Sequence, residues 1–200
     1  MKEISIEQLK GIAKAGDILL TSNPQGIGTV IRWFQELQGD PAFYTHTAII
    51  PDSFFITGYI LDANGTLDYK TIKKYKNKPI CVIRNREMTP ELYIKGFING
   101  LSDNIGQRYP YYRLILHAID NIGNCLLRKF HVKPKIHTAK LINFDNPVCS
   151  EWAAQFFVAS GISSFKYDWE GINPDDFDDC RQKYPEDWET IFEGLLINGG

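Results

Sequence analysis

Cys149 is the residue best placed to do chemistry, because it opens the stretch CSEWAAQFFVASG. This stretch is typical of a helix that begins just after Pro147 and ends at Gly161, with one apolar face made of Trp152, Ala153, Phe156 and Phe157. In a first helical turn, unpaired backbone N–H groups and the positive end of the helix dipole favour the thiolate and can also bind an oxyanion. Cys149 is therefore a predicted nucleophile. The alternative is a small buried apolar side chain.

A thiolate nucleophile needs a partner that accepts and donates a proton, and His46 is the candidate. It lies in THTAII (45–50), whose alternating β-branched residues predict a strand. A third group should fix the imidazole tautomer, and the next expected strand offers Asp62 and Asn64. Asp62 is preferred because a carboxylate also stabilises the imidazolium, although both residues precede Gly65 and also suit a turn.

The elements expected around these residues alternate between helices and strands. Ser5 and Gln8 form the two halves of a capping box for a first helix, and Thr89 followed by Pro90 marks the start of another. Further segments are expected to be strands at 17–21, 45–50, 54–63 and 79–84, the last three as a meander, and helices at 27–37 and from NPDD (173–176). Lys70, Lys73, Lys74, Lys76 and Lys78 are expected to form a solvated connector between two strands.

Composition limits the class of protein. With 44% hydrophobic and 23% charged residues among 200, the chain is expected to form one soluble globular domain over residues 1–200. A net charge of −2 gives no global attraction to nucleic acid, so no nucleic-acid partner is expected. The apolar runs are too short for a membrane-spanning helix, and the first 15 residues lack the apolar core of a signal peptide, which predicts a cytoplasmic protein.

The spacing of cysteines and histidines predicts neither a metal site nor another cofactor. The four cysteines contain no CxxC pair, and the four histidines lack the spacing of a helical zinc site. In a reducing compartment Cys81, Cys125 and Cys180 are expected to be unpaired and structural.

The ordered motifs GDILLT (16–21), THTAII, YILDANG (59–65), PICVIR (79–84), IGQRYPYY (105–112) and CSEWAAQFF (149–157) resemble the circularly permuted NlpC/P60 group, in particular YiiX/YebB-like cysteine hydrolases. The resemblance implies an α+β, papain-like fold, in which an antiparallel sheet or small barrel packs against helices that include the nucleophile helix. It implies Cys149 as nucleophile, His46 as base and Asp62 as the orienting residue, where the family more often has Glu. Tyr109 matches a family tyrosine that lines the substrate site, and Pro110 stands where Asp is usual.

The resulting expectation is a cysteine hydrolase that cleaves an amide bond, in a peptide or a cell-wall-type substrate, without a cofactor. Two alternatives remain. One is a lipid-directed acyl hydrolase or acyltransferase. The seven Lys and Arg against one Asp in residues 105–140 mildly favour it, although a solvated face that balances the acidic tail explains them better. The other is a catalytically silent binding module, for instance a virion- or envelope-associated component with the same fold.

Overall fold

A computed structural model describes residues 1–22, 43–108, 148–167 and 172–197 of the chain. Within these ranges the strands are β1 (Glu3–Ser5), β2 (Ile18–Thr21), β3 (His46–Ile49), β4 (Tyr59–Asp62), β5 (Asp68–Thr71), β6 (Pro79–Asn85) and β7 (Trp188–Ile197). The α-helices are α1 (Ile6–Ile12), α3 (Phe54–Thr57), α4 (Pro90–Gly96), α7 (Cys149–Ser160) and α8 (Pro174–Lys183). Shorter helical turns are η1 (Ile72–Tyr75), η2 (Phe97–Leu101) and η3 (Ser102–Asn104).

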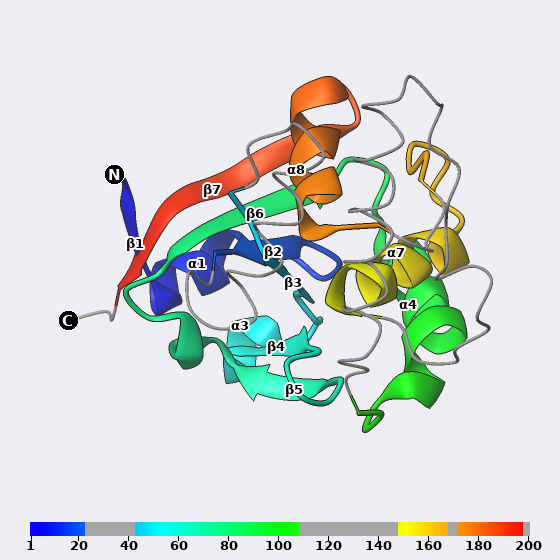
Figure 1. The fold of residues 1–200 in the computed structure, drawn as a ribbon, viewed down its shortest axis with the longest axis horizontal. Helices are drawn as coiled ribbons and strands as arrows, with labels where there is room; N and C mark the ends of the chain where they lie inside the picture. The colour runs from blue at the N-terminus through cyan, green and yellow to red at the C-terminus, as the bar shows by residue number, and fades with distance from the viewer. Residues whose placement is uncertain (23–42, 109–147, 168–171, 198–200) are drawn as a thin grey trace, which may run out of the picture.

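The strands form one mixed seven-stranded sheet in the order β1-β7-β6-β2-β3-β4-β5. The β1–β7 pair is parallel, and the other neighbouring pairs are antiparallel. The α+β class therefore agrees with expectation. Figure 1 shows α7 and α4 side by side at one end of the sheet, with β4 and β5 along its lower edge.

Alternate residues along the strands pack into two hydrophobic cores, one on each face of the sheet. Ile18 and Leu20 of β2 belong to the core that contains α7, α4 and α8, whereas Leu19 between them belongs to the core that contains α1, α3 and η1. The strands that carry the candidate site are thus held by apolar packing from both sides.

Helix α7, which begins at Cys149, is fixed by close contact with α4. At Gly96, at the end of α4, an added Cβ would lie 2.1 Å from Ser160 Oγ and 2.6 Å from the Phe156 carbonyl oxygen. Only glycine permits this approach, and the resulting contact positions the helix that begins at Cys149.

Two expectations for the strands were wrong. Residues 54–63 are not one strand, because Phe54–Thr57 forms α3, which Gly58 ends in a left-handed conformation (φ 65°) before β4 begins. The strand at 79–84 does not pair with β4, since β5 takes that place and β6 lies between β2 and β7. Strands β1, β5 and β7 were not expected from the sequence.

The predicted helix starts were correct at three places. Ser5 and Gln8 form the capping box of α1, Thr89 caps α4 with Pro90 in its first turn, and α8 starts after Asn173. The helix expected at 27–37 lies outside the described residues. In the described ranges, no helix combines the length and apolar character needed to cross a bilayer.

Candidate active site

The three candidate residues lie at element ends that meet at one place. Cys149 is the first residue of α7 and follows Val148, whose backbone is extended. His46 is the first residue of β3, and Asp62 is the last residue of β4. Asp62 pairs with Ala48 across the antiparallel β3–β4 ladder, so His46, two residues earlier, is its diagonal neighbour on the same face.

His46 lies between the other two side chains. Its Nε2 is 3.2 Å from Asp62 Oδ2, and its ring is also hydrogen-bonded to the Cys149 side chain. An ionised carboxylate only accepts hydrogen bonds, so Nε2 carries a proton and donates a hydrogen bond to Asp62.

The site is secluded from solvent. Asp62 is 0% exposed, Cys149 is 4% exposed and the His46 side chain is 14% exposed. Low exposure strengthens electrostatic interactions among the three groups, because less water screens them.

Asp62 and His46 each stabilise the charged form of the other. Burial disfavours the imidazolium, but the charges of Asp62 and the Cys149 thiolate, together with hydrogen bonds to both, raise the pKa of His46 to about 10. Burial likewise opposes the carboxylate, yet His46 and then Lys74 hold the pKa of Asp62 well below its usual range. The arrangement favours a thiolate–imidazolium pair backed by a carboxylate.

Asp62 has further partners that no sequence motif indicated. Lys74 Nζ lies 2.5 Å from Asp62 Oδ2, the Tyr75 hydroxyl donates a hydrogen bond to the same oxygen, and Lys70 Nζ lies 3.9 Å from Oδ1. Lys70 and Lys74 were expected to belong to a solvated connector, but both also interact with this buried carboxylate. Their approach depends on the β4–β5 pairing, which no local pattern around the lysines indicates.

Asn64, the alternative third residue, has a different position. Its backbone N–H donates to Asp62 Oδ1 at 2.7 Å, within the turn that precedes Gly65. Asn64 thus orients Asp62 through its main chain, and Asp62 is the group against the imidazole.

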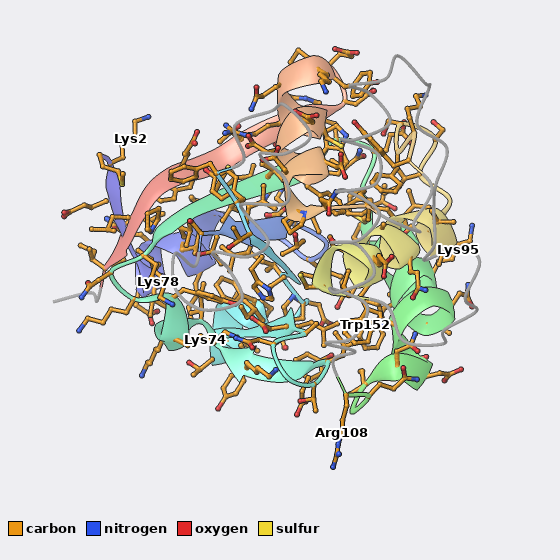
Figure 2. The ribbon with its side chains drawn as sticks, viewed as in Figure 1. Lys2, Lys74, Lys78, Lys95, Arg108 and Trp152 are labelled. Carbon is orange, nitrogen blue, oxygen red and sulfur yellow. The ribbon has the colours of Figure 1, made fainter. Side chains whose placement is uncertain are left out.

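Two buried polar groups near the site lack a hydrogen-bond partner in the part of the chain that the structure describes. They are Thr47 Oγ1, next to His46 in β3, and Trp152 Nε1, one turn after Cys149 in α7. Figure 2 shows Trp152 beside α7, toward the end of the sheet formed by β4 and β5.

The predicted substrate-binding residue Tyr109 lies outside the described residues, as do residues 109–140 of the basic segment 105–140. A cavity of about 700 Å³ lies among α1, α3 and α4, and its lining includes Phe54, Phe55, Met88 and Tyr93 but none of His46, Asp62 and Cys149. This cavity is separate from the candidate catalytic group.

The other described cysteines differ from Cys149. Cys81 and Cys180 are buried free thiols, and burial raises the pKa of each to about 12. They have the inert character expected of structural cysteines. Cys125 lies outside the described residues. Among the residues that are described, no three His, Cys, Asp or Glu side chains cluster in a way that could hold a metal ion.

Comparison with protein-family models finds no match to this chain, and comparison with curated proteins finds no significant relative.

Proposed function

We propose that the chain is a cysteine hydrolase that cleaves an amide bond in a peptide or cell-wall-type substrate through an acyl-enzyme on Cys149. The observation that carries the proposal is the position of His46, which is hydrogen-bonded to Asp62 through Nε2 and also to the Cys149 side chain. A nucleophile, a base and a group that orients the base form the minimal set for this chemistry.

The proposed reaction has two halves. The Cys149 thiolate attacks the carbonyl carbon, and the N–H groups of the first turn of α7 stabilise the oxyanion that forms. The His46 imidazolium gives its proton to the leaving amine as the C–N bond breaks, which leaves a thioester. His46 then takes a proton from water, the resulting hydroxide equivalent attacks the thioester, and the acid product leaves as Cys149 recovers its electron pair.

The order of the candidate residues along the chain also bears on the type of α+β fold. A histidine on a strand, a carboxylate on the next strand and a cysteine that opens a later helix follow the order of the permuted NlpC/P60 group. We propose on this resemblance that the α+β fold is papain-like. The seclusion of the site and the apolar packing of α7 are consistent with that assignment.

The test is turnover of the wild type and Cys149→Ser on peptide coumarylamides, muropeptides and short-chain phospholipids. We expect amide cleavage by the wild type and none by Cys149→Ser, because serine is not appreciably ionised by a helix start or an imidazole. Cys180→Ala is the matched control and should keep the activity.

The other possible results of the turnover test distinguish the alternative functions. Cleavage of phospholipid esters alone would replace the proposal by the lipid-directed alternative. An unaltered rate in Cys149→Ser, with unchanged thermal unfolding, would end the cysteine-hydrolase proposal. Absence of turnover on every substrate class would favour the silent binding module.

A further inference from the structure

The side chain of Asp62 is enclosed by more positive charge than an orienting carboxylate needs. Lys74 Nζ is 2.5 Å from Oδ2, whereas His46 Nε2 is 3.2 Å from the same oxygen. Lys74 is thus the nearer of two cations that share one carboxylate oxygen when His46 is protonated.

Local contacts in and around η1 fix the position of Lys74. Thr71 caps η1 by accepting a hydrogen bond from the Lys73 N–H, which sets the turn that carries Lys74 and Tyr75. The Lys74 ammonium lies 4.8 Å from the centroid of the Tyr75 ring, and Tyr75 is buried. Figure 2 shows Lys74 lying over the β4–β5 region, whereas Lys2 and Arg108 project away from the body of the molecule.

The charged and titratable groups around His46 come from several elements. They are Asp62 of β4, Lys70 of β5, Lys74 and Tyr75 of η1, and Cys149 of α7. Among the residues that the structure describes, β2 also places Thr21 opposite His46, and a threonine carries no titratable group. Among these groups, Lys70 and Lys74 oppose a positive charge on His46.

We infer that Lys74 is a positioning residue that shares Asp62 with His46 and thereby limits how strongly the imidazolium holds its proton. Asp62 alone, buried and ionised, would stabilise the imidazolium so far that transfer of its proton to a leaving group becomes slow. Lys74 compensates part of the carboxylate charge while keeping the carboxylate in place. The inference rests on the proposed function for its catalytic consequence, but the charge relation among Lys74, Asp62 and His46 does not depend on Cys149.

The test is the pH titration of His46 by NMR, with the signal assigned by its absence in His46→Ala. We expect Lys74→Met to raise the pKa of His46 by about one unit, since a cation a few ångströms away is removed. Lys73→Met, which removes an equal charge from an exposed neighbour in η1, is the matched control and should change it by less than about 0.2 unit. Lys74→Arg should restore the wild-type value. If Lys74→Met does not fold, the neutral Lys74→Gln carries the same expectation.

The titration is repeated in the Cys149→Ala background, where no thiolate is present. A shift there supports the inference even if Cys149 proves not to be a nucleophile. With Cys149 intact, the rate of Cys149 alkylation by iodoacetate is measured against pH. The high-pH transition of this rate should shift upward by as many pH units as the pKa of His46. A purely structural role of Lys74 would not cause that shift.

Three results would overturn or redirect the account. An unchanged His46 pKa in the Lys74 variants would overturn the inference, and a lowered one would show that Lys74 acts only by holding Asp62 in place. A shifted His46 titration without a shift in alkylation would keep the inference and contradict the proposed function.

Discussion

In the described part of the chain, two almost completely buried aspartates at strand ends have partners that differ in kind. Asp17, just before β2, is held by Arg84, whose Nε and Nη2 each lie 2.7 Å from one carboxylate oxygen. Asp62, at the end of β4, is held by His46, Lys74 and Tyr75. An arginine never loses its proton under physiological conditions, whereas a histidine does.

The electrostatic outcome also differs. Burial raises the pKa of Asp17 even though Arg84 is bonded to it, whereas His46 and Lys74 together lower the pKa of Asp62 against the effect of burial. The first pair, Asp17 and Arg84, links the loop after α1 to β6, and its arginine does not exchange a proton. The second contains a group that can change its protonation state, so a buried carboxylate indicates chemistry only when its partners can titrate.

The largest expected effect on stability is that of Asp62→Ala. It leaves Lys74 and the Tyr75 hydroxyl without their shared acceptor, so the free energy of unfolding should fall by about 4 kcal/mol. In the double variant Asp62→Ala/Lys74→Met the loss should be smaller than the sum of the two single losses by at least about 1 kcal/mol. Denaturant unfolding of the four proteins measures this, and additive losses would mean that the two charges do not interact.

Arg84→Met tests the other aspartate. It removes both bonds to Asp17 and the bond to the Ile12 carbonyl oxygen, so we expect a loss of about 3 kcal/mol in unfolding free energy. Arg86→Met, which removes an exposed side chain paired with Glu189 at 3.0 Å, is the matched control and should cost less than about 1 kcal/mol. Alkylation of Cys149 should be unaffected in both variants, and a marked drop in Arg84→Met would break the separation between the two regions.

His46→Ala is expected to slow alkylation of Cys149 at pH 6 by about a hundredfold. Without the imidazolium the thiol returns toward its ordinary pKa, so little thiolate is present at that pH. Rates of iodoacetamide incorporation measure the change, and thermal unfolding verifies that the variant is folded. An unchanged rate would show that the helix start alone activates Cys149.

The smallest effect concerns the pH dependence of stability. The pKa of His46 is raised from 6.5 to about 10, so its protonation stabilises the fold fully below pH 6.5, and this stabilisation is lost as the pH rises toward 10. For Asp62, whose pKa is lowered, the contribution is present above the ordinary aspartate pKa of 3.8 and is lost on acidification below it. The melting temperature of the wild type minus that of His46→Gln should therefore decrease between pH 6.5 and 10, and a constant difference would refute the raised pKa.

Local signals in the sequence were sufficient to predict the elements that carry Cys149 and His46. The capping residues, the glycine at 161 and the alternation in THTAII each report a short-range constraint, and the structure has a helix from Cys149 and a strand from His46. Asp62 could be proposed because adjacent antiparallel strands bring diagonal residues together.

The remaining features depend on long-range pairing. The place of β6 between β2 and β7 and the existence of β1 and β7 follow from contacts between the two ends of the chain. The role of Lys74 likewise follows from the turn η1 folding back against β4. A lysine-rich segment has the same composition whether it faces solvent or a buried carboxylate.

The central claim is that Cys149 is an activated thiol, and site-resolved mass spectrometry of iodoacetamide labelling between pH 5 and 9 tests it most directly. Cys149, Cys81 and Cys180 are all nearly buried, at 4%, 0% and 1% exposure, so accessibility alone does not favour Cys149 strongly. The account predicts that at pH 6 Cys149 reacts at least about a hundredfold faster than the other two, because only Cys149 has a helix start and an imidazolium beside it. Labelling of Cys149 at the same rate as Cys81 and Cys180, rising only above pH 8, would contradict it.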